Sequence, residues 1–206
     1  MSDNVVDLNA VRNRTEITRS EIMPMSEYGA IRNDRRKALV AIKKLRRVPI
    51  GPDATFYFES YDTMWFQIHE MLFIEKGGEE QIADELAAYN PLIPKGRELV
   101  ATLMFEIDDE VLRRSILGRL GGVEETVFMK FGDHEVIAVA EEDIDRTTAD
   151  GKASSVQFLH FKFTDEQAEA FRSGDGDIVL GMRHENYPHM TLLQPATRKA
   201  LAADFS

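Results

Sequence analysis

Alternation of apolar and polar residues is strongest in the second half of the chain. The segment SSVQFLHFKF, residues 154–163, places Gln157, Leu159, Phe161 and Phe163 on one face and Val156, Phe158, His160 and Lys162 on the other. This period of two is typical of a strand with one buried face. Similar patterns predict strands in ATFYFES (54–60), RELVATLMFEI (97–107), ETVFMKF (125–131), HEVIAVA (134–140) and, as the final strand, DIVLGM (177–182).

Helical spacing of apolar residues dominates the first half. It predicts helices over about 26–47, 62–76, 79–89 and 108–120, with a shorter one from 164 and a terminal one near Pro195. Thr18 with Glu21, and Thr164 with Gln167, have the spacing of capping boxes. The stretch VPIGPD, residues 48–53, is rich in proline and glycine and is predicted to break the first long helix without forming regular structure.

This order of elements predicts the fold class and the domain organisation. Helices come first and strands interrupted by short helices follow, which favours an α+β fold: a mainly antiparallel sheet of about six strands packed with an N-terminal helical lobe. A length of 206 residues, 43% of them hydrophobic, suits one core. We expect residues 1–16, which are polar and aperiodic, to form a disordered tail, and residues 17–206 to form a single domain.

Composition and motifs exclude several classes of function. The chain has no cysteine, so it forms no disulfide and offers no thiolate as a nucleophile or metal ligand. It contains no phosphate-binding loop with its lysine, no dinucleotide-binding glycine motif and no GxSxG elbow, so no cofactor is predicted. No signal peptide or apolar membrane span is visible, and we expect a cytoplasmic protein with no membrane partner.

The charge is unevenly distributed along the chain. The net charge is −11, yet residues 32–47 hold eight basic side chains and one acidic one. Such a basic stripe can meet RNA, an acidic partner or the acidic remainder of the same chain. We favour internal pairing and rank RNA binding last, because the whole chain is strongly acidic.

The predicted helix over 62–76 holds the only tryptophan of the chain, Trp65, and three polar residues among large apolar ones. It is apolar nearly all round, which predicts a buried helix. Gln67 and Glu70 then lie at a solvated seam or bond to neighbouring backbone, and His69 lies apart from them. The alternative is that Glu70 is partly buried, has a raised pKa and acts as a base or ligand.

The histidines are spaced poorly for a metal site. His69, His134 and His184 each precede a glutamate, but none has the second histidine of an HExxH motif. His184 and His189 can approach each other across a loop with Glu185 as a third ligand, and they are the candidates for a metal. Loop histidines that bind nothing are more common, so no metal is predicted.

Several segments in order resemble one family. EYGAIRNDRRKALVAIKKLRRVPIGPDATFYFES, YDTMWFQIHEM, AAYNPLIP and SSVQFLHF are similar to an uncharacterised bacterial family known as domain of unknown function 3501, over about Ile17 to Tyr187. The shared pattern includes Arg46, Arg47, Val48, Gly51, Pro52, Phe58, Glu59, Thr63, Gln67, Ile68, Glu70 and Met71. The chain departs from it at His69, where the pattern has glutamine, and at Glu185, where it has proline. Both departures weaken the metal hypothesis.

The resemblance implies no known reaction. It implies an accessory role in redox chemistry or peroxide defence, beside rubrerythrin-like or iron–sulfur oxidoreductase-like proteins. We therefore expect a protein that binds a partner or a small anionic ligand, with Arg46 and Arg47 holding the anion near Glu59, Gln67 and Glu70. A purely structural arrangement is also compatible with the sequence, in which the two arginines pair with Glu59 and Glu70 and only join strand to helix. Two further hypotheses are an enzyme that uses Glu70, with or without a metal, and an RNA-binding module that uses the basic stripe.

Overall fold

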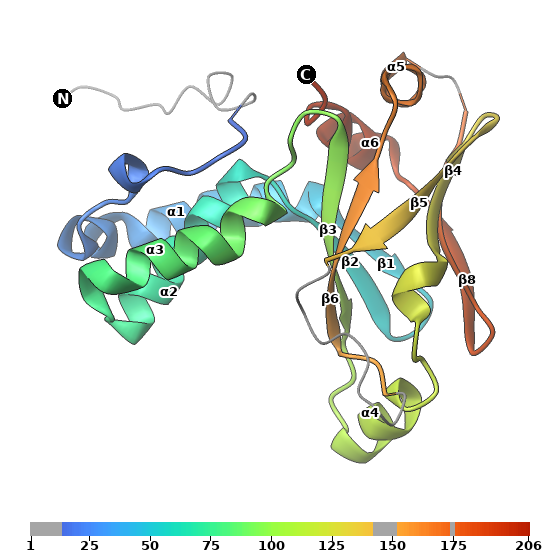
Figure 1. The fold of residues 1–206 in the computed structure, drawn as a ribbon, viewed down its shortest axis with the longest axis horizontal. Coiled ribbons are helices and arrows are strands. Elements are labelled where there is room, and N and C mark those ends of the chain that lie inside the picture. Colours follow the sequence, from blue (N-terminus) through green and yellow to red (C-terminus); the bar gives the residue numbers. More distant parts are fainter. Residues whose placement is uncertain (1–13, 142–151, 174–175) are drawn as a thin grey trace.

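The computed structural model describes residues 14–141, 152–173 and 176–206. Figure 1 shows a lobe of three long helices extending from one side of a curled sheet, with shorter helices at the two ends of the sheet. The lobe consists of α1 (Met25–Arg46), α2 (Tyr61–Glu75) and α3 (Gly78–Tyr89). The end helices are α4 (Glu110–Leu117), α5 (Asp165–Ser173) and α6 (Pro195–Ala202), and short 3-10 turns are η1 (Arg19–Glu21), η2 (Asn90–Leu92) and η3 (Val123–Thr126).

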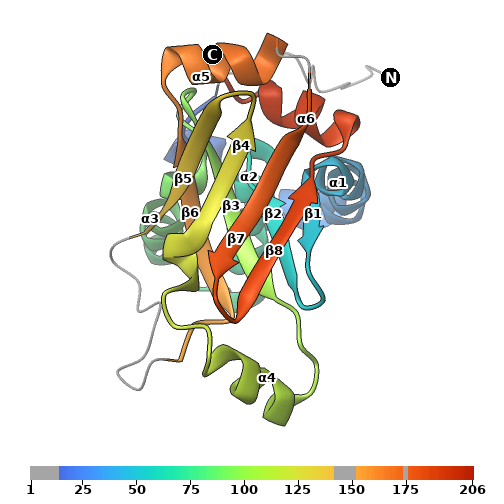
Figure 2. The same cartoon turned by 90° about the vertical axis from the view of Figure 1, so that its right-hand side faces the viewer.

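Eight strands in the described part of the chain form one antiparallel sheet. They are β1 (Arg47–Ile50), β2 (Ala54–Phe58), β3 (Glu98–Phe105), β4 (Val127–Phe131), β5 (His134–Ala140), β6 (Val156–Lys162), β7 (Ile178–His184) and β8 (Tyr187–Leu192). Their order is β1-β2-β3-β6-β5-β4-β7-β8. The sheet curls until β8 contacts β1, so that it nearly closes into a barrel (Figure 2).

One tyrosine joins the two edges of the barrel. The Tyr187 hydroxyl donates to the Ile50 carbonyl oxygen at 3.0 Å and accepts from the Asp53 backbone N–H at 2.9 Å. Gly51, in the turn between these partners, has a φ of +62°, and a Cβ there would lie 2.7 Å from the Tyr187 hydroxyl oxygen. The turn therefore needs glycine both for its backbone conformation and for its close approach to β8.

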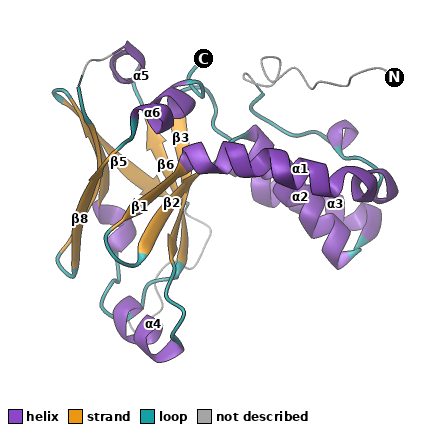
Figure 3. Cartoon of the chain, turned by 180° about the vertical axis from the view of Figure 1, so that it is seen from behind, coloured by secondary structure: helices purple, strands orange, loops and turns teal. Residues whose placement is uncertain are grey.

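Two separate groups of buried apolar side chains form the cores. One fills the barrel with the inward faces of its strands, and the aromatic rings of Phe163, Phe171 and Phe205 close one end of it. The other lies inside the helical lobe and includes Ile68, Leu72 and Ile93. Val100 of β3 and Phe158 of β6 point outward from the barrel into this second core. The lobe thus rests on the outer face of the sheet, as seen from behind in Figure 3.

The predicted α+β class and antiparallel sheet are confirmed, but the prediction of about six strands is wrong. The two additional strands are β1 and β8, so residues 177–182 do not form the last strand. β1 contains Pro49 and β8 contains Pro188, and proline together with nearby glycine indicates turns in a sequence. Proline is tolerated here because both strands are edge strands, whose outer side needs no ladder hydrogen bond.

Most predicted helices are confirmed, and the two predicted capping boxes are present. Glu21 accepts from the Thr18 backbone N–H at 2.8 Å, and the reciprocal bonds between Thr164 and Gln167 are present at the start of α5. The prediction that α2 is buried nearly all round is wrong at Ile74, which is 62% exposed. Within the described residues, no helix is long and apolar enough to cross a membrane. The predicted tail falls mostly on residues 1–13, outside the described residues, whereas the Arg14 guanidinium donates to Glu21 and Tyr61.

We predict that Tyr187→Phe lowers the free energy of unfolding by about 1–3 kcal/mol, because it leaves the Ile50 carbonyl and the Asp53 N–H without their shared partner. Tyr57→Phe is the matched control, since its hydroxyl donates to Glu106 at an exposed position. The control should lose less than about 1 kcal/mol. Urea denaturation measures both variants, and equal losses would contradict a special role of Tyr187 in closing the barrel.

Candidate functional site

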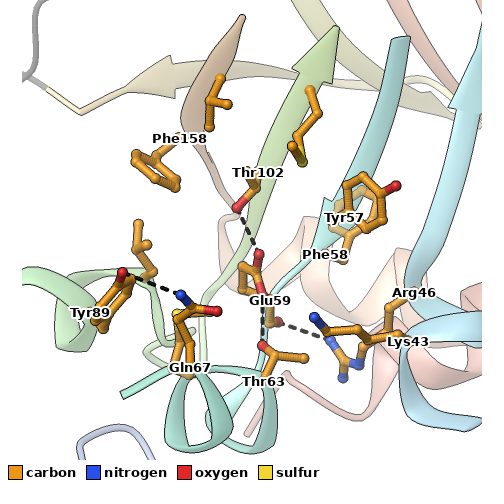
Figure 4. Close-up of a pocket in the computed structure, with 14 residues that line it drawn as sticks. Lys43, Arg46, Tyr57, Phe58, Glu59, Thr63, Gln67, Tyr89, Thr102 and Phe158 are labelled. Atoms are coloured by element: carbon orange, nitrogen blue, oxygen red, sulfur yellow. Dashed lines mark hydrogen bonds between the residues drawn. The ribbon is translucent and has the colours of Figure 1, made fainter. Parts of the chain in front are cut away.

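A pocket of about 280 Å³ lies where the helical lobe meets the outer face of the barrel. Residues of α1 and α2, the α3–η2 corner and the outer faces of β2, β3 and β6 surround it. Its lining consists of Lys43, Arg46, Tyr57, Phe58, Glu59, Thr63, Met64, Gln67, Tyr89, Leu92, Thr102, Met104, Val156 and Phe158 (Figure 4). It is slightly smaller than typical pockets for drug-sized ligands, which span about 300–1,000 Å³.

Glu59 is the central polar group of this pocket. It follows β2 directly and precedes Ser60, the residue that caps α2. One carboxylate oxygen accepts from the Thr63 hydroxyl at 2.6 Å and the other accepts from the Thr102 hydroxyl at 2.7 Å. The residue is only 9% exposed. Within the described residues, no Lys, Arg or His nitrogen lies within 4.0 Å of this carboxylate.

Arg46, at the end of α1, lies beside Glu59, but its guanidinium does not bond to the Glu59 carboxylate. Its two terminal nitrogens bind the two Asp204 oxygens at 2.8 and 2.5 Å. They also donate to the carbonyl oxygens of Glu59 and Ala200. Burial raises the pKa of Asp204, and the charge of Arg46 opposes this shift. The buried ion pair therefore ties α1 to the C-terminal segment that follows α6.

The remaining walls of the pocket are mainly apolar. Met64, Leu92, Met104, Val156 and Phe158 contribute side chains from both the lobe and the barrel. Two further polar groups lie around them: the Gln67 amide nitrogen donates to the Tyr89 hydroxyl at 3.4 Å, and Lys43 lies exposed on α1 at the rim. The pocket thus combines one buried carboxylate, one amide and a cation at its rim with a largely apolar surface.

The structure brings together three of the five residues predicted as a site. Arg46, Glu59 and Gln67 all line the pocket, whereas Arg47 and Glu70 do not. Arg47 is exposed, stacks over the Tyr57 ring and bonds to Glu106 at 3.4 Å. The hypothesis that the two arginines pair with the carboxylates of Glu59 and Glu70 is wrong, because their partners are Asp204 and Glu106.

Glu70 lies on the other side of α2 and holds α1 to it. Its carboxylate accepts from the Arg32 Nε and Nη2 atoms at 2.7 and 2.8 Å and from the Tyr28 hydroxyl at 2.7 Å. The hydrogen bond from Arg32 lowers the pKa of Glu70. The alternative hypothesis of a raised pKa at Glu70 is therefore wrong, and the carboxylate has a structural role.

His69 is fully buried within the helical lobe and is also structural. Its Nδ1 atom bonds to the Trp65 carbonyl oxygen at 2.7 Å, and its Nε2 atom accepts from the Met23 backbone N–H at 3.1 Å. Its ring lies 3.8 Å from the Trp65 ring, centroid to centroid. Burial lowers the pKa of His69, which keeps the ring neutral. These contacts explain a histidine placed among large apolar residues.

His184 and His189, the two histidines considered as metal ligands, make contacts with other groups. His184 bonds to the Gly121 carbonyl oxygen at 3.2 Å and accepts from the Asn186 backbone N–H. His189 packs against the Tyr187 ring at the seam of the barrel. Across the part of the chain that the structure describes, no three His, Asp or Glu side chains are placed to hold a metal ion.

One polar cluster was missed from the sequence. His160, on the outer face of β6, lies between two carboxylates, with Nδ1 at 3.1 Å from Glu98 and Nε2 at 2.8 Å from Glu141. Burial opposes its protonation, but the bonds to Glu98 and Glu141 raise the pKa of His160. The alternation of β6 predicts that His160 faces outward, but only strand pairing places Glu98 of β3 and Glu141, the residue after β5, beside it.

The basic stripe is largely occupied by contacts within the chain. Of its eight basic residues, four form ion pairs: Arg32 with Glu70, Lys37 with Asp34, Arg46 with Asp204 and Arg47 with Glu106. A fifth, Arg35, stacks over Trp65. These contacts support the internal pairing that the sequence favours over RNA binding.

Comparison with known proteins agrees with the fold and the resemblance. The chain belongs to the family described as "Protein of unknown function (DUF3501)", which matches residues 16–205. A solved structure of a novel protein of unknown function from Burkholderia pseudomallei is 37% identical, with a TM-score of 0.85, and the match covers 92% of this chain and 99% of that one. No curated protein matches the chain.

We predict that Asp204→Asn lowers the free energy of unfolding by about 3–5 kcal/mol, because it leaves Arg46 buried without its counter-charge. Glu135→Gln is the control, since Glu135 pairs with Arg183 at a largely exposed position. The control should cost less than about 1 kcal/mol. Chemical denaturation of both variants tests the contrast, which fails if Asp204→Asn is as mild as the control.

We predict that His69→Gln changes how stability depends on pH. The pKa of His69 is lowered by folding, while in the unfolded chain it returns to about 6.5. The unfolded chain therefore binds more protons as the pH falls below about 6.5, and this destabilises the wild type. Glutamine offers a similar donor and acceptor but does not titrate.

The measurement is the free energy of unfolding of both proteins between pH 7.5 and pH 5. The advantage of the wild type over His69→Gln should shrink as the pH falls. His160 titrates in both proteins, so its contribution cancels in the difference. A difference that stays constant across this range would show that His69 is not held neutral by the fold.

Proposed function

We propose that this protein binds a small ligand in the pocket between the helical lobe and the barrel. The observation that carries this proposal is the Glu59 carboxylate, which lies buried beside apolar walls with two neutral hydroxyls as its side-chain partners. A buried charge is costly unless it is paired or fully hydrogen-bonded. A ligand that bonds to Glu59 offsets this cost.

The position of Glu59 also supports a binding role. Arg46 lies next to it but donates to its backbone carbonyl and to Asp204, so Arg46 forms no ion pair with the Glu59 carboxylate. Thr63 comes from the lobe and Thr102 from the barrel, and each orients one carboxylate oxygen. The carboxylate is therefore held in place by both parts of the fold, as expected for a preorganised contact.

An accessory binding role in a redox or peroxide-defence system is our proposal for the wider context. It is supported by the family resemblance, which implies rubrerythrin-like or iron–sulfur oxidoreductase-like partners and agrees with the expected cytoplasmic location. Arg47 is the exposed member of the two arginines considered for an acidic partner. An enzyme that uses Glu70 is disfavoured, because Arg32 and Tyr28 occupy that carboxylate.

We predict that Val156→Phe, which adds a ring at the outward face of β6 within the pocket, abolishes small-molecule binding there. A set of small aromatic amines, alcohols and carboxylates is added to the isotope-labelled protein, and backbone amide shifts are recorded by NMR. In the wild type, the shifts should concentrate on Glu59, Thr63, Gln67 and Thr102.

Ile137→Phe is the control for this experiment. It adds a similar ring on β5 at an exposed, outward-facing position that does not line the pocket. The control should keep the wild-type response while Val156→Phe loses it. If no compound perturbs the pocket residues of the wild type, the proposed function is wrong.

A further inference from the structure

We infer that the ligand of this pocket is a small organic cation, a protonated amine or guanidinium group attached to an apolar body about the size of one ring. This inference rests on the proposed function and names its ligand class. It replaces the small anionic ligand that the sequence predicted at Arg46 and Arg47. Three features of the pocket carry it: its charge balance, its hydrogen-bonding groups and its aromatic walls.

The charge balance at the base of the pocket is negative. Both terminal nitrogens of Arg46 bind Asp204, so the guanidinium in the lining is already paired with a carboxylate. An anion entering here would add a second negative charge beside Glu59, whereas a cation would supply a counter-charge.

The hydrogen-bonding groups that face the pocket are mainly acceptors. An ionised carboxylate has about four acceptor positions, and the side chains of Thr63 and Thr102 use two of those on Glu59. The Gln67 nitrogen is directed to Tyr89, so its carbonyl oxygen is turned towards Glu59 (Figure 4). Two acceptors therefore converge, and an ammonium or guanidinium group has only donors to offer them.

The walls suit the rest of such a molecule. Tyr57, Tyr89 and Phe158 bring aromatic rings to the lining, and aromatic faces attract cations that lie against them. Met64 and Leu92 add apolar surface for a ring or short chain. Lys43 is the other basic residue of the lining, and its exposed place on α1 puts its charge at the rim.

A cation should bind at Glu59, whereas an anion should bind at Lys43, so probes of different charge test the inference. Three probes of similar size are compared on the full-length protein at pH 7 by calorimetry: benzylammonium, benzyl alcohol and benzoate. We expect benzylammonium to bind at least about tenfold more tightly than the other two. Glu59→Gln should weaken benzylammonium about tenfold, while Lys43→Gln, which removes a like charge at the rim, should strengthen it slightly.

Circular dichroism and thermal melting show whether Glu59→Gln folds. If it does not fold, a second variant takes its place. Gln67→Leu removes an acceptor outside the Glu59–threonine network, and it should weaken benzylammonium several-fold with little effect on benzyl alcohol. Equal losses for both probes would instead indicate a change of shape and would overturn the cation assignment.

The outcomes separate this inference from the proposed function. If benzyl alcohol or benzoate binds as tightly as benzylammonium, and Glu59→Gln has no effect, the pocket binds ligands but their class is not cationic. If benzoate binds best and Lys43→Gln weakens it, the ligand is an anion held at the rim. If none of the three probes binds and none shifts the pocket residues, both the inference and the proposed function fail.

Discussion

The buried ion pair between Arg46 and Asp204 is the interaction on which the arrangement of this protein depends. Arg46 is the last residue of α1, and the next residue already belongs to β1, so the pair lies where the lobe joins the barrel. Asp204 comes from the other end of the chain, after α6. By also binding the Glu59 carbonyl, Arg46 fixes the segment between β2 and α2. The end of α1, the connection from β2 to α2 and the segment after α6 are thus held together by one side chain.

The pocket lies between the barrel and the helical lobe because each of them has its own apolar core. The barrel is filled by its inward-facing side chains, and the lobe has its own apolar centre, which takes in Val100 and Phe158 from the outer face of the sheet. Beside that contact, the outer faces of β2, β3 and β6 are only partly covered. Glu59 lies in this gap because it occupies the short connection that leads from β2 to α2. A polar residue is tolerated there because a hydroxyl from each side donates to its carboxylate, although neither hydroxyl balances its charge.

Charge in this molecule is used mainly to join elements. Glu70 connects α2 to α1 through Arg32 and Tyr28, and Glu106 receives bonds from Thr55, Tyr57 and Arg47 on neighbouring strands. His160 is likewise held between two glutamates. In each of these contacts a carboxylate has a basic side chain as a partner. Glu59 differs from these carboxylates, because its side-chain partners are the neutral hydroxyls of Thr63 and Thr102, and this difference is why we propose it as the binding group.

The sequence by itself determined the local elements of this protein. Alternation placed Leu159 and Phe161 inside and Phe158 and His160 outside, and capping residues such as Thr164 marked where helices begin. These features depend on neighbours within a few positions, so periodicity and cap chemistry are enough to predict them. The same local rules concealed β1 and β8, because Pro49 and Pro188 indicate turns until an edge position in a sheet is known.

Only the tertiary structure decided which charged groups meet. Arg46, Glu59 and Gln67 were predicted as a site and do share a pocket, but Glu70, three residues beyond Gln67, faces α1 instead. The partner of Arg46 is 158 positions away in the chain, and Thr102 reaches Glu59 from 43 positions away. Such contacts are set by how the lobe packs on the barrel. No local pattern encodes them, because the physical neighbours of a buried charge are chosen by the packing of distant elements.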